Sequence, residues 1–323
     1  MAEQGNDPDL FVAGHLILGT NRTFYEDLRA GLDHFEKGIA HYLPEIHRSR
    51  HSRFGSDPGV SCYITSAINL WMLGFPDTAL KRVNDTKDLA KSLNHPFSIA
   101  YATFHTGLLY LWTCEPDLAL EHSQAVLELV DEYEFDIWKA VGLCLQGAAL
   151  VRLGKIDEGL SQIQLGMEKY QGLKTPPIFW TMLTFNQAEA YLYAGKPERG
   201  LALLTESMST VHQDQEGALR AEFYRLTGDL LLAVSPENAS EAENIYQHAL
   251  RISREQEARL LELRASTRLS RLWLEQDRHE DAYQMLSQAY QALTEGFDLA
   301  DLIEAKALLD AIEHESGSLP THS

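Results

Sequence analysis

The chain turns at Leu73-Gly74-Phe75-Pro76-Asp77-Thr78-Ala79, and this pattern of residues recurs along the sequence. In each copy a glycine or polar residue ends one helical segment, and a proline or acidic residue opens the next. A small residue then follows at a similar offset: Ala79, Ala119, Gly159, Gly200, Ala242 and Ala282. Neighbouring positions in this series lie about 40 residues apart, and a repeat of this length is typical of a solenoid built from helix pairs.

Apolar residues on both sides of each turn have the spacing of amphipathic helices. Tyr101, Phe104 and Leu108 precede the turn at Cys114, and Val126 and Val130 follow it. No run of alternating residues is long enough to predict a strand. The sequence therefore predicts an all-α protein, a right-handed α-solenoid of about seven helix hairpins with a C-terminal capping helix.

We expect residues 1–323 to form one superhelical domain. The predicted repeats are residues 8–43, 60–93, 97–133, 137–171, 178–213, 216–257 and 259–294, followed by a cap at 298–314. The small residue in the second helix of each unit should let its two helices approach closely, because a larger side chain would force them apart.

The composition narrows the classes of function. The chain has 27 basic and 47 acidic residues, a net charge of −20, which opposes nucleic-acid binding through phosphate repulsion. No apolar run reaches the roughly 18 residues of a membrane span, and the acidic N-terminus lacks the features of a signal peptide. Cys62, Cys114 and Cys144 form no pairing pattern, which favours a reduced, cytoplasmic protein.

The arrangement of small residues resembles the tetratricopeptide repeat. Small residues lie in the middle of the first helix and early in the second, as in Gly107 with Ala119 and Gly228 with Ala242. The spacing is longer than the roughly 34 residues of the standard repeat, which indicates longer helices.

A more specific resemblance covers nearly the whole chain. It rests on Asp57-Pro58-Gly59-Val60, Leu70–Leu80, His95-Pro96-Phe97-Ser98, Glu262–Trp273 and Thr294-Glu295-Gly296-Phe297-Asp298. These motifs resemble the tetratricopeptide-like C-terminal region of bacterial signalling ATPases of the AAA type. Such proteins often also carry a class III adenylate or guanylate cyclase domain or a protein-kinase domain. The resemblance implies that this chain is the sensor or scaffold region of such a regulator, or a stand-alone relative.

The sequence carries none of the common catalytic motifs. There is no Gly-x-x-x-x-Gly-Lys-Ser/Thr phosphate loop, because Gly154-Lys155 and Gly195-Lys196 precede Ile156 and Pro197 in the turns between helices. The motifs of serine hydrolases, zinc proteases, dinucleotide-binding folds and cyclase metal sites are also missing. We therefore expect no enzymatic activity, no cofactor and no catalytic metal.

A basic segment interrupts this acidic chain between Pro44 and Gly59. It contains His47, Arg48, Arg50, His51 and Arg53. Its histidines match no standard metal-ligand spacing, and the arginines would repel a cation. Two roles stay open for this segment: pairing with neighbouring acidic helices, or recognition of an anion or acidic segment.

The first helix of each unit is expected to line the concave surface of the solenoid. By helical phase, an apolar set lies on that side: Ile64, Ile68, Trp71, Tyr101, Phe104, Leu108 and Phe185. A groove with this lining would bind an amphipathic helix or an extended peptide. The alternative is that these residues pack between the units.

An arginine face is expected toward the C-terminal end of the solenoid. Arg264, Arg268 and Arg271 lie at i, i+4 and i+7 on one helix, and Arg225 has a comparable phase in the preceding unit. Like charges at this spacing repel each other, so something must compensate them. A bound anion or acidic partner would do so, and so would Glu222, Asp229 and Glu262. In the family named above, Arg264 and Arg271 match common residues, which favours buried ion pairs.

These patterns predict a non-enzymatic scaffold that binds a protein or peptide, and the family resemblance implies that it acts in bacterial signal transduction. An upstream ATPase or cyclase module is one candidate partner, and no nucleic acid or membrane partner is expected. The alternative is a solenoid that senses a small ligand, such as an inducer or a nucleotide. The apolar groove favours the first interpretation, and the arginine face favours the second.

Because the sequence has neither a phosphate loop nor the paired metal carboxylates of a cyclase, we expect the purified chain to have no activity on ATP. It should neither hydrolyse nor cyclise ATP, which a phosphate-release assay and chromatography of the nucleotide products would measure. Turnover that survives repurification and disappears when a single residue of this chain is replaced would show that the chain is an enzyme.

Overall fold

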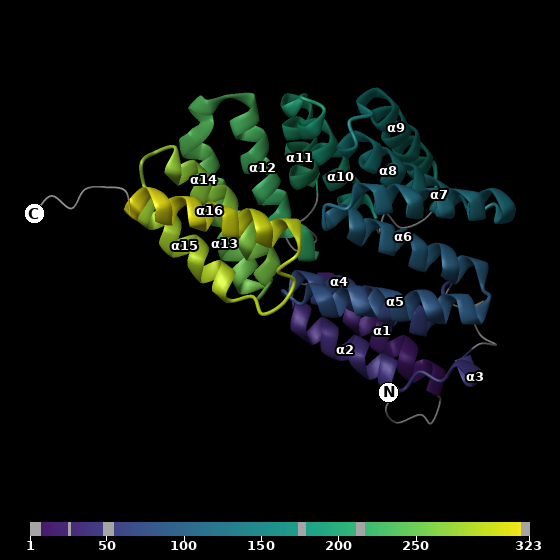
Figure 1. Ribbon diagram of the computed structural model, residues 1–323. Coiled ribbons are helices and arrows are strands. Elements are labelled where there is room, and N and C mark those ends of the chain that lie inside the picture. The colour runs from purple at the N-terminus through teal and green to yellow at the C-terminus, as the bar shows by residue number, and fades with distance from the viewer. Residues whose placement is uncertain (1–7, 25–26, 48–54, 174–178, 211–216, 318–323) are drawn as a thin grey trace, which may run out of the picture.

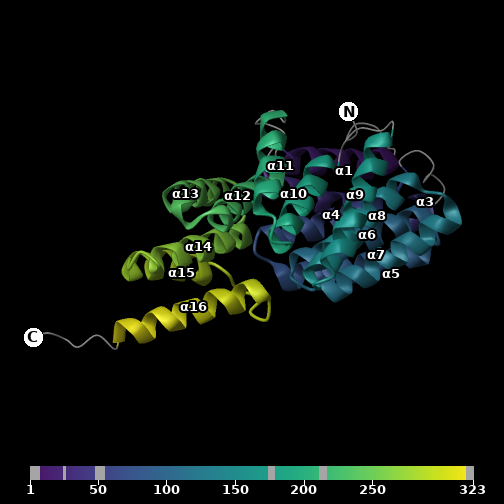
Figure 2. The same ribbon diagram turned by 90° about the horizontal axis from the view of Figure 1, so that it is seen from above.

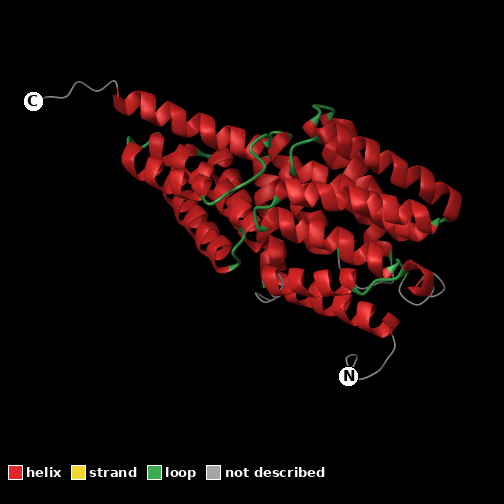
Figure 3. Ribbon diagram, turned by 60° about the horizontal axis from the view of Figure 1, so that its bottom comes forward, coloured by secondary structure: helices red, strands yellow, loops and turns green. Residues whose placement is uncertain are grey.

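A computed structural model describes residues 8–24, 27–47, 55–173, 179–210 and 217–317. These residues form α-helices and two short 3-10 helices, and contain no strand (Figure 3). The expected all-α class is therefore confirmed for this part of the chain. No helix within these ranges has the length and apolar character needed to cross a membrane.

The helices follow one another as hairpins (Figure 1). The pairs are α1 (Pro8–Phe24) with α2 (Leu28–Ala40), α4 (Pro58–Met72) with α5 (Pro76–Leu93), α6 (Pro96–Trp112) with α7 (Pro116–Tyr133), α8 (Asp136–Arg152) with α9 (Ile156–Gly172), α10 (Trp180–Tyr193) with α11 (Pro197–Thr210), α12 (Arg220–Val234) with α13 (Ala239–Glu255), and α14 (Arg259–Leu274) with α15 (His279–Gln291). The last helix among the described residues is α16 (Ala300–Gly317). Short helices α3 (Pro44–His47), η4 (Gly217–Leu219) and η5 (Pro236–Asn238) lie in the connections.

The turn residues act as the sequence predicts. Proline occupies the first turn of α4, α5, α6 and α7, where its missing N–H leaves no helical hydrogen bond unmade. Gly74 has a φ of 91° at the end of α4, and Gly154 has 82° at the end of α8. Cys114 and Asp277 adopt the same left-handed conformation, with φ of 62° and 61°. The turns of different units thus have the same backbone conformation, even where another residue stands in place of glycine.

The small residues predicted at close helix contacts lie at such contacts. Ala79, Ala119, Ala242 and Ala282 are fully buried. A Cβ atom on Gly159 would lie 2.5 Å from the carbonyl oxygen of Gly147 in the paired helix, so only glycine fits there. This prediction is confirmed, and the hairpins are held together by close approach of their backbones.

The last hairpins return to the first ones, so the solenoid closes on itself. Figure 1 shows the loop before α16 beside α5, and Figure 2 shows α12 to α16 as one arm against the earlier helices. One apolar core contains Leu28 and Trp71 from the first units together with Leu260 and Leu302 from the last. Trp71 also stacks on Trp112, with ring centroids 5.5 Å apart. Closure brings together residues from opposite ends of the sequence.

Replacing Ala119 by leucine tests the close contact between α6 and α7. Ala119 is fully buried, so the larger side chain should lower the free energy of unfolding by about 1–3 kcal/mol through overpacking. Ala125→Leu is the matched control, because Ala125 lies on the exposed face of the same helix. Equal urea midpoints for the two variants would contradict the close contact.

Candidate functional site

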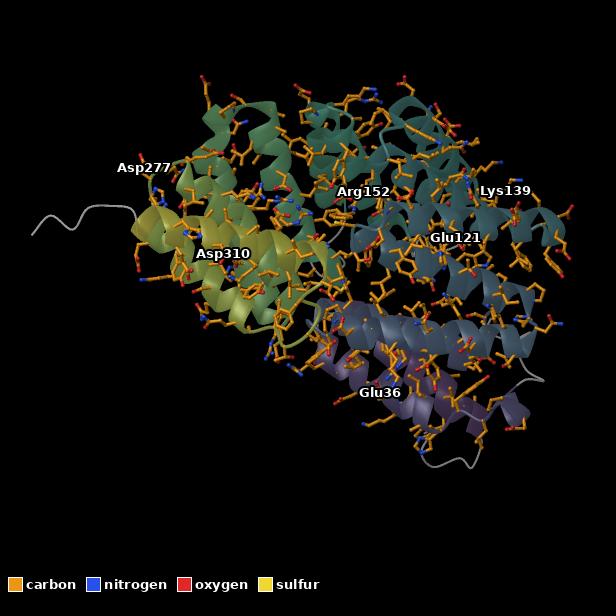
Figure 4. The ribbon with its side chains drawn as sticks, in the orientation of Figure 1. Glu36, Glu121, Lys139, Arg152, Asp277 and Asp310 are labelled. Atoms are coloured by element: carbon orange, nitrogen blue, oxygen red, sulfur yellow. The ribbon has the colours of Figure 1, made fainter. Side chains whose placement is uncertain are left out.

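A cavity of about 390 Å³ lies between the first helices of the units. Its walls come from α8, α10, α12, α14 and α16, with contributions from α13 and the turn after α6. Figure 4 shows Arg152, one of the lining residues, near the middle of the molecule. The charged lining consists of Arg152, Glu189, Arg225, Asp229, Arg264, Arg268, Arg271, Glu275, Asp301 and Glu304. Leu192, Tyr193, Leu226, Leu232, Tyr246 and Leu272 are among its apolar and aromatic residues.

The four predicted arginines meet at this cavity. Arg264, Arg268 and Arg271 share one face of α14 because of their i, i+4 and i+7 spacing, and Arg225 reaches the same space from α12. The other sides of α14 pack into the core through residues such as Leu263 and Leu269. Packing therefore turns the arginine face toward the cavity.

Arg225 lies at the centre of a buried ion network. Its Nε and Nη2 atoms donate to the two carboxylate oxygens of Glu222, at 3.0 and 3.1 Å. Its Nη1 atom donates to Asp229 at 2.5 Å, and the hydroxyl of Tyr246 donates to the other oxygen of Asp229 at 2.7 Å. Two-pronged contacts of this kind fix the guanidinium in position.

Glu222 is charged although its side chain is only 2% exposed. Burial by itself would raise the pKa of this carboxyl group, but the guanidinium groups of Arg225 and Arg264 lower the pKa below its usual value. The carboxylate form is therefore retained at neutral pH. Removing this charge would leave two buried cations short of a partner.

Arg264 joins four different parts of the chain. It donates to Asp301 of α16 at 2.7 and 3.0 Å, to Glu222 of α12 at 3.3 Å, and to the carbonyl oxygen of Trp112 at the end of α6. Its guanidinium also lies over the ring of Trp71 in α4, 4.8 Å from the centroid. Burial acts to lower the pKa of Arg264, but Asp301 and Glu222 raise it overall, so the cation persists.

Arg268 and Arg271 are the most accessible of the predicted arginines. Arg268 donates to one oxygen of Glu304 at 2.9 Å, and Arg271 forms an ion pair with the same oxygen, also at 2.9 Å. Arg268 also lies 3.5 Å from Asp229. Their side chains are 36% and 52% exposed, compared with 7% for Arg225. N–H donors of this pair therefore face the space of the cavity.

Arg152 completes the lining and was not identified from the sequence. It ends α8, donates to Glu189 at 2.5 Å and to the carbonyl oxygen of Leu111 at 2.7 Å, and lies over the ring of Tyr193. Cys114 has no basic neighbour in sequence, but a nitrogen of Arg152 lies 3.7 Å from its sulfur. These contacts join adjacent units, so sequence spacing gives no signal for them.

The structure shows which carboxylates neutralise the positive charges of the arginines. Glu222 and Asp229 pair with Arg225, as one of the predicted alternatives requires, whereas Glu262 pairs with Arg254 outside the cavity. Counting the charged lining residues gives five arginines and five carboxylates. The cavity is thus electrically balanced, and it offers both hydrogen-bond donors and acceptors.

The predicted apolar groove is not an open surface, and this expectation is wrong. Five of its seven residues are at most 2% exposed, and they are Ile64, Trp71, Phe104, Leu108 and Phe185. Ile68 and Tyr101 are half-buried and pack against the same cores. The physical reason is that neighbouring first helices, such as α4 with α6 and α6 with α8, contact each other directly. The apolar stripe therefore packs between the units.

Most of the basic segment predicted between Pro44 and Gly59 is not described by the structure, and His47 ends α3. Arg48, Arg50, His51 and Arg53 lie outside the described residues. Within the described residues, no group of three or more histidine, cysteine, aspartate or glutamate side chains has the geometry to hold a metal ion.

Comparisons with known proteins concern the fold. No family model and no curated protein matches the sequence. Among solved structures, the Rap protein complexed with competence and sporulation factor has a TM-score of 0.58 at 16% identity, over 95% of this chain and 83% of that chain. NprR in complex with its cognate peptide NprX has a TM-score of 0.56 at 13% identity, over 97% and 85%.

A third similar structure is a Signal Transduction ATPase with Numerous Domains from Pyrococcus horikoshii, which has a tetratricopeptide repeat sensor. Its TM-score is 0.51 at 12% identity, and the match covers 98% of this chain but 48% of that one. This chain thus spans about half the length of that ATPase. The matches establish a tetratricopeptide-like solenoid fold, as predicted. A link to a cyclase or kinase domain stays a prediction.

Glu222→Gln tests the buried ion network. Loss of the charge should lower the free energy of unfolding by about 3 kcal/mol at pH 7, because Arg225 and Arg264 keep their buried charges. Since the folded-state pKa of Glu222 is lowered, its contribution is present above the usual value of 4.5 and is lost as pH falls below it. The variant should therefore lose less stability than wild type on acidification.

The matched control for this experiment is Glu255→Gln. Glu255 forms an exposed i, i+4 pair with Arg251, so its replacement should change stability by less than about 0.5 kcal/mol. Chemical denaturation between pH 3 and pH 7 provides the measurement. Identical acid profiles for wild type and Glu222→Gln would contradict the charged state assigned to Glu222.

Proposed function

We propose that this chain is a non-enzymatic, tetratricopeptide-like scaffold that binds a peptide segment of a protein partner in its central cavity. The observation that carries the proposal is the cavity itself, where charged and apolar side chains from several helices converge. Convergent polar groups within an apolar frame are typical of binding sites.

The balance of charges favours a peptide over a polyanion. Five arginines are matched by five carboxylates, so a nucleotide triphosphate would meet as much repulsion as attraction. A peptide backbone offers donors and acceptors in equal number, and its side chains can carry either charge. The mixed lining therefore suits a peptide better than a cluster of phosphates.

The accessible residues indicate how such a segment would bind. Arg268, Arg271 and Tyr193 present exposed polar or aromatic surface to the cavity, whereas Arg225 and Glu222 are buried beneath them. A guanidinium binds a carboxylate through two parallel hydrogen bonds. We therefore assign Arg268 and Arg271 to ligand contact, and Arg225 and Arg264 to holding the site in shape.

A role in bacterial signal transduction is the second part of the proposal. Structures with a similar fold include two proteins complexed with a factor or peptide and one signalling ATPase with a repeat sensor. The motifs resembling bacterial signalling ATPases support the same class. We propose that the chain acts in the cytoplasm as the regulatory region, or a stand-alone relative, of an ATPase linked to a cyclase or kinase.

A small-ligand sensor is the second candidate. A cavity of about 390 Å³ falls within the range of about 300–1,000 Å³ that small-molecule sites occupy. A thermal-shift screen against nucleotides and sugars separates the two candidates, because binding of a small ligand raises the unfolding temperature.

Arg271→Glu tests peptide binding at the cavity. A binder is first selected from a random peptide library on the wild-type protein, and its affinity is measured by fluorescence polarisation. The charge reversal should weaken binding by at least about tenfold, because the exposed donors of Arg271 become acceptors. Arg251→Glu is the matched control, since Arg251 is 55% exposed on α13 and does not line the cavity. Equal loss in both variants, or a library without binders, would overturn the proposal.

A further inference from the structure

The arginine face of α14 already holds carboxylates supplied by the chain itself. Asp301 of α16 accepts two hydrogen bonds from Arg264. Glu304, one turn later, accepts a hydrogen bond from Arg268 and forms an ion pair with Arg271. We propose that α16 is a built-in occupant of the partner-binding face, and that the partner is an acidic amphipathic helix that displaces it. This inference rests on the proposed function and specifies its partner and its regulation.

The side chains of α16 define the kind of helix that fits this face. Asp301 and Glu304 are spaced i, i+3 and therefore lie on one side of the helix. Leu302, Ala305 and Leu309 are at most 7% exposed and belong to the core formed with α14 and α15. A competing helix thus needs two carboxylates at the same i, i+3 spacing and apolar residues beside them.

Charge also selects the displacing partner. When α16 leaves, Arg264, Arg268 and Arg271 lose Asp301 and Glu304, and two carboxylates of α12 stay close to this face, namely Glu222 and Asp229. The exposed face would then carry an excess of positive charge within a protein of net charge −20. A ligand that replaces α16 must supply the missing negative charges, because arginines left without a counter-charge would make the exchange unfavourable in free energy.

The loop that leads into α16 is fastened to the second hairpin. The backbone N–H and the hydroxyl of Thr78 donate to the carboxylate of Glu295, at 2.9 and 3.1 Å. In return, the N–H of Gly296 donates to Asp77 at 3.0 Å. The N-cap residue of α5 is Phe75, whose side chain cannot accept a hydrogen bond, so Glu295 caps this helix instead. We call this reciprocal contact the latch.

The latch leaves no room for a side chain at Gly296, but its hydrogen bonds are accessible to solvent. Gly296 has a φ of 78°, and a Cβ atom there would lie 2.1 Å from Cγ of Pro76. The hydrogen bonds between Thr78 and Glu295 are exposed, so water can replace them. Figure 2 shows α16 along the edge of the arm formed by α14 and α15, with the C-terminal end of the helix farthest from the earlier helices. The helix can therefore leave without passing through the rest of the chain.

A labelled synthetic peptide of residues 299–314 tests this proposal on the full-length protein. The double variant Asp301→Asn/Glu304→Gln removes the two charges of α16 that pair with the arginines. The added peptide should therefore bind this variant about tenfold more tightly than it binds the wild-type protein. A peptide with asparagine and glutamine at the same two positions should lose this gain. Asp310→Asn is the control, because Asp310 pairs with Lys306 of α16 and does not line the cavity (Figure 4).

A second variant, Glu295→Gln, loosens the latch and leaves every cavity residue unchanged. Hydrogen exchange in α16 should become faster, and the affinity for the peptide should rise. Because Glu295 does not touch the arginines, these two effects would show that release of α16, and not altered charge at the arginines, opens the face. Slow exchange in α16 together with equal peptide affinity in all variants would overturn the inference. That result leaves binding of the library peptide intact, so it is distinguishable from failure of the proposed function.

Discussion

The guanidinium group of Arg264 is the point on which the closed form of the solenoid depends. It lies over Trp71 of α4 and donates to the carbonyl oxygen of Trp112, to Glu222 of α12 and to Asp301 of α16. A cation can be buried at this depth only when charges and carbonyl dipoles surround it. Each of these partners comes from a different part of the array, so satisfying one side chain fixes the relative positions of several helices.

Closure changes the way in which this repeat protein gains stability. In an open solenoid each unit contacts its neighbours, and stability is close to a sum of local terms. Here one core contains residues of the first and last units, and Glu295, which follows the last hairpin, caps α5 in the second. The ends of the chain therefore stabilise each other, and the central cavity gains a wall from α16. A site at such a junction responds to anything that moves the capping helix.

Part of the site could be anticipated from single residues. The i, i+4, i+7 spacing of Arg264, Arg268 and Arg271 predicts a shared face, and their mutual repulsion predicts a compensating negative charge. Glu222 and Asp229 were candidates for that charge, beside a bound anion or acidic partner. Asp301 and Glu304 could not be predicted as the further partners, because they lie beyond α15 and the loop that follows it. The same limit applies to Arg152 and Cys114, which meet across two units. Apolar residues such as Trp71 and Phe104 have the same helical phase whether they line a groove or pack between helices.

The sequence by itself determined the repeat, the starts of the helices and the close contact within each hairpin. These features depend on residues a few positions apart: proline at a first turn, glycine in a left-handed conformation, and alanine or glycine where two backbones meet. Only the tertiary structure decided that the array closes, that Asp77 and Thr78 meet Glu295 and Gly296, and that the arginines are neutralised. The reason is that curvature accumulates from a small rotation at every hairpin, and no local motif encodes that sum.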